Sequence, residues 1–279
     1  MGYNGGMKKL LTLAGACLLA GVASAGLTVK DGDKVAFMGD SITQFGNDPG
    51  GYVQLVMKGF EVLGVDVKKL AAGTSGNKSN DMLKRLDRSV LKAKPQFMTL
   101  SCGVNDVWHG ARGVELEDYK KNISEILDKC AASNVTVIVL TATVIGEDHP
   151  ERPMNAKLVG YNEFLRETAK ARGLALADVA ADLQEAMKEF EPKHGVFHYT
   201  RDGVHMAWDG NRLMARGVLK AFGATADDIV RIEAAWRTMP GTSQVSTFLS
   251  RADYERYQQE AKTRGVKVSD VIAERLSAK

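Results

Sequence analysis

The stretch AFMGDSITQFG, residues 36–46, contains a short apolar run that ends abruptly in a glycine, Asp40 and Ser41. A serine hydroxyl is a weak nucleophile by itself and needs a neighbouring base, which a third group must orient. His205 lies in the segment TRDGVHMAWDG, three residues after Asp202 and with a glycine between them. A carboxylate at this spacing can fold back onto the imidazole Nδ1–H and leave Nε2 free to take a proton from a serine. The spacing is therefore compatible with serine-based acyl transfer.

These residue types also have ordinary explanations. Glycine, aspartate and serine are common in the turns that end strands, and Asp202-Gly203 is a strong turn dipeptide. A second serine, Ser75 in AAGTSGN, is a near match to the G-x-S-x-G turn of α/β-hydrolases, but Asn77 stands where that motif has its last glycine. We therefore expect Ser75 to line the mouth of the site rather than to attack the substrate.

Acyl transfer also requires hydrogen-bond donors where negative charge develops on the carbonyl oxygen. Three groups could supply them: the backbone N–H of Ser41, the backbone N–H of Gly73 and the side-chain amide of Asn105. Only glycine would allow a close backbone approach at position 73, directly after a strand. Taken singly, Gly73 and Asn105 are equally compatible with turns.

The elements that must position these residues alternate between strands and helices. Continuous apolar runs, typical of strands covered on both faces, predict strands over residues 34–39, 65–72, 97–102, 135–143 and 174–179. Amphipathic patterns predict helices over residues 52–63, 80–91, 116–132, 155–172 and 209–222. The alternation predicts a three-layer α/β/α sandwich with right-handed crossovers. In such a sheet the ligand site lies beyond the carboxyl ends of the strands, where the polar clusters fall.

Four blocks of this sequence resemble, in order and spacing, the motif blocks of the SGNH, or GDSL, hydrolase superfamily. They are GDSIT (39–43), the glycine of AAGTSGN, GVND (103–106) and DGVH (202–205), and the resemblance extends from about residue 33 to residue 222. It implies a flavodoxin-like sheet of about five parallel strands. It implies no cofactor.

The resemblance also implies roles for individual residues. The nucleophile, general base and orienting carboxylate would be Ser41, His205 and Asp202. The oxyanion donors would be Ser41, Gly73 and Asn105. Two further carboxylates would hold the loops of the site, namely Asp40 and Asp106.

The substrate is indicated less directly. The sequence GVNDVWHG places Trp108 beside Asn105, and similar continuations occur in extracellular members that resemble carbohydrate acetylesterases. An aromatic ring near the mouth can stack on a sugar, although Trp108 is equally compatible with packing. The sequence has no long apolar lid of the kind a lipase uses. We therefore expect a serine esterase acting on O-acetylated carbohydrates. The alternatives are a lipolytic esterase or thioesterase of broad acyl range and a non-catalytic glycan-binding module.

The N-terminus predicts export. Lys8 and Lys9 precede the apolar stretch LLTLAGACLLAGVASAG, which predicts a signal peptide over residues 1–25, cleavage after Ala25 and a secreted or periplasmic protein without stable membrane insertion. The alternative is an N-terminal membrane anchor. Cleavage lowers the formal net charge from +3 to +1, which argues against a nucleic-acid partner. Of the remaining cysteines, Cys102 and Cys130, we expect two free buried thiols rather than a disulfide.

A metal site is not expected from the sequence. His194 and His198 are four residues apart, as helical ligand pairs often are, but Gly195 between them disfavours a rigid helix. No further cluster of cysteine or histidine residues along the chain supports a metal ion.

The hydrolase domain is expected over residues 26–224 and a C-terminal helical extension over residues 225–279. The extension contains predicted helices over residues 227–238, 251–264 and 268–276 and a short strand over residues 245–250. A strand followed by two helices resembles a ribbon-helix-helix DNA-binding unit. After position 240 the chain has seven basic and five acidic residues, and this excess of basic charge is too small for DNA binding. A secreted protein also meets no DNA. We expect the extension to pack on the domain or on a second copy of the chain.

Overall fold

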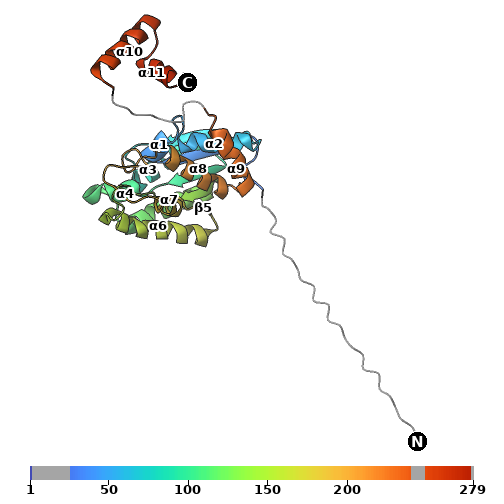
Figure 1. The fold of residues 1–279 in the computed structure, drawn as a ribbon. Helices are drawn as coiled ribbons and strands as arrows, with labels where there is room; N and C mark the ends of the chain where they lie inside the picture. Colours follow the sequence, from blue (N-terminus) through green and yellow to red (C-terminus); the bar gives the residue numbers. More distant parts are fainter. Residues whose placement is uncertain (2–25, 240–248, 278–279) are drawn as a thin grey trace.

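The computed structural model describes residue 1 and residues 26–239 and 249–277 (Figure 1). The predicted signal peptide beyond Met1 lies outside the described residues, as does most of the strand predicted over residues 245–250. Within the described parts of the chain, none of the helices combines the length and the apolar character needed to cross a lipid bilayer.

The sheet has five parallel strands in the order β2-β1-β3-β4-β5. The strands are β1 (Lys34–Gly39), β2 (Lys68–Gly73), β3 (Phe97–Ser101), β4 (Thr136–Leu140) and β5 (Ala175–Ala177). This is the doubly wound order of flavodoxin-like folds, so the predicted fold class is confirmed. The register pairs Gly39 with Gly73, which brings the ends of β1 and β2 to the same edge.

Four of the five strands, β2 to β5, are shorter than predicted, and side chains explain the difference for β4. Beyond Leu140, the backbone of Ala142 is bonded on both sides by the amide of Asn162, which accepts from its N–H at 2.7 Å and donates to its carbonyl at 2.9 Å. The backbone N–H and carbonyl of Ala142 are therefore both hydrogen-bonded without a neighbouring strand. At the start of β2, Asp66 instead pairs with the loop at Asp31 and Gly32.

Helices cover both faces of the sheet, as the sandwich requires (Figure 1). One face carries α2 (Tyr52–Val62), α7 (Val179–Met187), α8 (Trp208–Ala221) and α9 (Ala226–Trp236), and the other carries α3 (Ser79–Ser89), α5 (Leu116–Ala132) and α6 (Pro153–Arg172). Short helical turns also lie between the strands and these helices, namely α1 (Ser41–Phe45), α4 (Val104–Trp108), η1 (Leu91–Ala93) and η2 (Gly110–Arg112).

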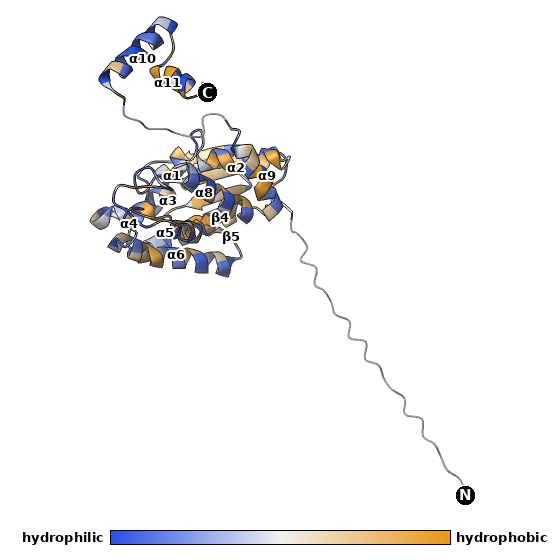
Figure 2. Cartoon of the chain, viewed as in Figure 1, coloured by the Kyte–Doolittle hydropathy of each residue, from blue (hydrophilic) through white to orange (hydrophobic). Residues whose placement is uncertain are grey.

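The helices form where the sequence places an apolar stripe and suitable ends. In α5 the buried residues recur three or four apart, at Tyr119, Ile123, Ile126, Leu127 and Cys130. In α6 a proline occupies the first turn, and Gly173 ends the helix in the left-handed conformation at φ 63°. Figure 2 shows hydrophilic and hydrophobic residues alternating along α6, and hydrophobic residues along α2 and α9.

The helix α9 belongs to the sandwich, although it lies within the predicted C-terminal extension. Its residue Trp236 is fully buried and donates its indole N–H to the carbonyl of Leu55 in α2 at 2.9 Å. Ile232 on the same face is also fully buried. The packed core therefore continues well past residue 224.

The last two helices, α10 (Arg251–Arg264) and α11 (Val268–Ser277), form a hairpin that Figure 1 draws apart from the sandwich. Gly265 ends α10 in the left-handed conformation, at φ 65°, as a C-cap glycine. Two ion pairs join the helices: Arg264 with Glu274 at 2.7 Å, and Arg275 with Glu260 at 3.0 Å. These elements match the predicted helical pair.

Candidate active site

Ser41 is the first residue of α1, and Asp40 alone separates it from the end of β1 at Gly39. Asp40 caps this helix, because its Oδ1 accepts the N–H of Ile42 at 2.9 Å. The residues after β1 form this one-turn helix rather than the plain turn that was the alternative explanation for Asp40 and Ser41. The arrangement holds Ser41 at the carboxyl edge of the sheet, where 7% of its surface is exposed.

Ser41, His205 and Asp202 form one continuous chain of hydrogen bonds. The Nε2 atom of His205 lies 2.9 Å from Ser41 Oγ, and its Nδ1 lies 2.7 Å from Asp202 Oδ2. The other carboxylate oxygen of Asp202 accepts the backbone N–H groups of His205 at 2.8 Å and Val204 at 3.1 Å. The structure thus brings together the three residues that the sequence singled out.

The surroundings of Asp202 keep it ionised. Burial by itself would raise its pKa, but the hydrogen bonds from the backbone and ring of His205 and from the backbone of Val204 outweigh burial and hold the pKa below its usual value. A charged carboxylate at Nδ1 fixes the imidazole tautomer, so that Nε2 can accept the serine proton.

The loop that carries His205 is held by a buried carboxylate that the sequence analysis missed. Glu147 accepts hydrogen bonds from the backbone N–H groups of His198, Tyr199 and Thr200 at 2.7–2.9 Å and from the Thr200 hydroxyl at 2.5 Å. The Thr200 hydroxyl in turn accepts the N–H of Gly203 at 3.0 Å. Gly203 has φ 91°, which explains the glycine between Asp202 and His205.

Gly73 lies directly against the backbone of α1. A Cβ at this position would come within 2.4 Å of the Gln44 nitrogen, so only glycine fits. Ser75, two residues on, donates its N–H and its hydroxyl to Gln44 Oε1 at 2.7 and 2.9 Å. These two bonds anchor the loop after β2 to α1.

Asn105 is buried at the start of α4, where Gly103 provides the chain reversal at φ 135°. Its amide nitrogen donates to the carbonyl of Asn77 at 3.1 Å, and its Oδ1 lies 3.2 Å from His109 Nε2. An amide nitrogen carries two protons, so one N–H of Asn105 remains for a ligand. His109 fixes the orientation of the amide, a contact that the sequence did not reveal.

The next residue, Asp106, fastens two loops of the site together. It accepts the backbone N–H of Ser79 at 2.9 Å and the Ser79 hydroxyl at 2.6 Å, which links α4 to the start of α3. Burial raises the pKa of Asp106, and burial raises the pKa of Asp40 to about 6. Cys102 and Cys130 are both buried and free, and the Cys102 sulfur lies 3.5 Å from Asp106 Oδ2.

Arg85 is a second buried charge that the sequence analysis missed. Its guanidinium donates to the carbonyl of Gly39 at 2.8 Å and to Asn77 Oδ1 at 2.6 Å, and therefore connects β1 to the loop that holds Asn105. The available signal was its place on the apolar face of α3, between Met82 and Leu86, because an arginine on a buried face has a partner inside the protein.

Two aromatic rings flank the histidine. The ring centroid of Phe45 lies 5.1 Å from that of His205, and the centroid of Trp108 lies 6.4 Å from it, both with the rings inclined edge to face. Trp108 is 41% exposed. It therefore presents an apolar surface to solvent beside the reactive residues rather than filling the core.

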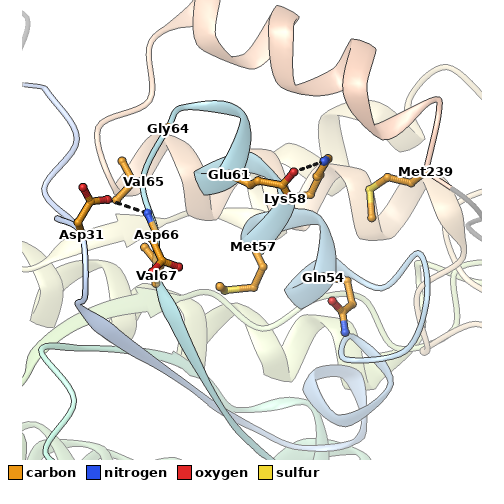
Figure 3. Close-up of a pocket in the computed structure, with 10 residues that line it drawn as sticks. All are labelled: Asp31, Gln54, Met57, Lys58, Glu61, Gly64, Val65, Asp66, Val67 and Met239. Carbon is orange, nitrogen blue, oxygen red and sulfur yellow. Dashed lines mark hydrogen bonds and ion pairs between the residues drawn. The ribbon is translucent and has the colours of Figure 1, made fainter.

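A separate hollow of about 770 Å³ lies beside α2 and the amino end of β2 (Figure 3). It is lined by Asp31, Gln54, Met57, Lys58, Glu61, Gly64, Val65, Asp66, Val67 and Met239. Lys58 and Glu61 form an ion pair on its wall at 2.5 Å. Because Ser41 follows the carboxyl end of β1, this hollow lies at the other end of the sheet, away from the serine.

Comparison with known proteins finds similarity over most of the chain. A profile of the GDSL-like lipase/acylhydrolase family matches residues 37–213. An acetylxylan esterase of Geobacillus stearothermophilus is 24% identical over 217 residues, covering 71% of this chain and 97% of that protein.

Two solved structures extend the comparison. The acetyl xylan esterase AlAXEase is 30% identical, with a TM-score of 0.61, over 67% of this chain and 98% of its own. LAE5, described as an alpha/beta hydrolase enzyme from the metagenome of Lake Arreo in Spain, is 26% identical, with a TM-score of 0.64, over 71% of this chain and 98% of its own.

Proposed function

The chain belongs to the GDSL-like lipase/acylhydrolase family and is an ester hydrolase of the SGNH/GDSL type, and from this premise we propose that it removes O-acetyl groups from carbohydrates through an acyl-serine intermediate. The observation that supports the proposal most is the hydrogen-bond chain Ser41–His205–Asp202.

In the proposed reaction His205 takes the proton of Ser41 as Oγ attacks the ester carbonyl carbon. Asp202 stabilises the imidazolium that results. The negative charge on the carbonyl oxygen is received by the N–H groups of Ser41 and Gly73 and by the side-chain amide of Asn105. The imidazolium then gives its proton to the ester oxygen of the sugar as its bond to the carbonyl carbon breaks, which releases the sugar hydroxyl and leaves an acetyl group on Ser41.

Deacylation repeats these steps with water as the nucleophile. His205 takes a proton from the water as it attacks the acyl carbon, and then returns a proton to Ser41 Oγ as acetate departs. Metal or cofactor chemistry plays no part in either half of the proposed reaction.

Two observations support a carbohydrate as the alcohol part of the ester. Relatives are named acetylxylan and acetyl xylan esterases. The exposed ring of Trp108 beside His205 offers an apolar face on which a sugar can stack. We also propose that the protein is secreted or periplasmic, on the pattern of charged, apolar and small residues over positions 8–25.

The test is acetate release from acetylated xylo-oligosaccharides, run beside hydrolysis of p-nitrophenyl acetate and p-nitrophenyl octanoate. We expect acetate release and a steep preference for the acetyl ester. The variant Ser41→Ala should lose several orders of magnitude in kcat, whereas Ser75→Ala, the matched control in the neighbouring loop, should stay active. Preference for octanoate would indicate a lipolytic esterase, and glycan binding without turnover would indicate a binding module.

A further inference from the structure

We propose that Asp148, His149 and His194 form a binding site for a divalent transition-metal ion. The chemistry of the ligands favours Zn²⁺. The ion would join the segment that contains residues 148 and 149 to the segment that contains residue 194. These three residues, the His–His–Asp cluster, are separate from Ser41, His205 and Asp202. Asp148 and His149 are adjacent in the sequence, and the fold brings His194, 45 positions after His149, beside them.

The geometry of the cluster suits a single ion. His149 Nε2 lies 3.0 Å from His194 Nδ1, which lies 3.4 Å from Asp148 Oδ2, and the three ligand atoms all lie within 4.8 Å of one another. In a tetrahedral zinc site with bonds of 2.0–2.1 Å, neighbouring ligand atoms are about 3.3 Å apart. Small side-chain adjustments would therefore let all three atoms reach one ion.

The ligand types favour zinc over magnesium or calcium. Two imidazoles and one carboxylate are typical of Zn²⁺ and its transition-metal neighbours, whereas Mg²⁺ and Ca²⁺ prefer oxygen ligands alone. Three protein ligands leave the fourth position to water. The histidines are partly or fully accessible, with side chains 37% and 83% exposed at His149 and His194, so an ion can enter from solvent.

A fourth residue supplies an independent sign of a metal site. Glu151 Oε1 lies 3.1 Å from His149 Nδ1, on the side of the ring opposite the cluster. A carboxylate that accepts Nδ1–H leaves the Nε2 lone pair pointing toward the ion, and metal-bound histidines usually have such a partner. Asp148 is fixed as well, because its Oδ2 accepts the N–H of Gly195 at 3.2 Å.

The cluster differs from the pair His194 and His198, which the sequence analysis considered as metal ligands and did not support. His198 takes no part in it; its ring stacks on Phe190 with centroids 3.9 Å apart. His194 instead faces His149, whose position in the fold the sequence did not indicate. His198 is therefore a natural control for the neighbouring His194.

The site lies next to the contacts that hold the catalytic loop. Glu147, which precedes Asp148, binds the backbone from His198 to Thr200. The N–H groups of Gly146 and Glu147 donate to the carbonyl of Gly203 at 2.8 and 3.1 Å. An ion joining Asp148 and His149 to His194 would stiffen this connection. It would touch none of the reacting groups, so we assign it a positioning role.

The experiment is calorimetric titration of untagged protein with Zn²⁺ at pH 7.5, after chelator treatment and desalting, with the melting temperature measured in parallel. We expect one Zn²⁺ per chain in the cluster and a rise of about 5–10 °C in Tm at a hundredfold excess over Kd. His194→Ala and His149→Ala should lose this binding, and His198→Ala should keep it. Glu151→Gln should weaken it about 10-fold or more.

The opposite results would overturn the proposal. If the wild type binds no Zn²⁺ in the submillimolar range, or if His194→Ala binds it as well as the wild type, the 3.0 Å contact is a hydrogen bond between two histidines only. Substitution at the highly exposed His194 should leave the fold intact, which circular dichroism of each metal-free variant checks. Binding does not depend on esterase activity, so failure here leaves the proposed function standing.

Discussion

The buried charge of Asp40, directly before the proposed nucleophile, leads to a quantitative prediction for the variant Asp40→Asn. Asparagine keeps the cap, because its side-chain oxygen can accept the N–H of Ile42 as Asp40 does. The substitution therefore removes the charge and preserves the shape. Only 2% of the Asp40 surface is exposed, so little water is available to solvate the ionised carboxylate.

The size of the effect follows from the pKa. Burial raises the pKa of Asp40 from 3.8 to about 6, which corresponds to about 3 kcal/mol at 1.36 kcal/mol per pH unit. A carboxyl whose pKa is raised in the folded state binds more protons there than in the unfolded chain. It therefore makes the folded state less stable as the pH rises from about 4 to about 6. Above that range the cost, about 3 kcal/mol, is present in full.

Urea unfolding of the wild type and of Asp40→Asn between pH 4 and pH 8 measures this cost. Any pH-independent effect of the amide cancels when the two ends of the range are compared. From pH 4 to pH 8, we expect the free energy of unfolding of the variant to rise by about 2–3 kcal/mol relative to that of the wild type. Asp48→Asn, at an exposed aspartate, is the control and should show a constant difference. A constant difference for Asp40→Asn, or a relative loss at high pH, would refute the reasoning.

Three further substitutions test the site. Gly73→Ala places a methyl group 2.4 Å from the Gln44 nitrogen and should lower the free energy of unfolding by about 1–3 kcal/mol; wild-type stability in denaturant would contradict the close packing. Asn105→Ala should lower kcat about 10²–10³-fold with the fold intact, and unchanged steady-state kinetics would exclude its amide as an oxyanion donor. Asp202→Asn should lower kcat about 10⁴-fold by favouring the wrong tautomer of His205, and a loss below tenfold would contradict an orienting role.

The sequence predicts the sheet well because its strands are continuous apolar runs, and β1 has the predicted bounds. It does not predict α7. The segment LALADVAADL is apolar on both sides of Asp178, and a short apolar run does not by itself distinguish a strand from a buried helix. In the structure the strand ends before Asp178 and a helix begins after it, because the Asp178 carboxylate caps α7 by accepting the backbone N–H of Ala181.

The candidate site is predictable where its members lie in short, ordered motifs, as Ser41 and His205 do. The contacts that support it are not, because they join distant segments. Arg85 meets the carbonyl of Gly39 across 46 positions, and Glu147 meets Tyr199 across 52. The amphipathic pattern of α3 indicates that Arg85 is buried, but no local pattern identifies the partner of Arg85 or of Glu147, so only the folded chain shows how these buried charges are paired.

The central claim is that Ser41 is the nucleophile and that His205 activates it. Diethyl p-nitrophenyl phosphate phosphorylates an activated serine and leaves a stable adduct that peptide mass mapping can locate. We predict one phosphoryl group per chain, on Ser41, slow or absent labelling in His205→Ala and normal labelling in Ser75→Ala. A stoichiometric adduct on Ser75 or on any other residue, or no adduct in an active wild-type enzyme, would contradict the account.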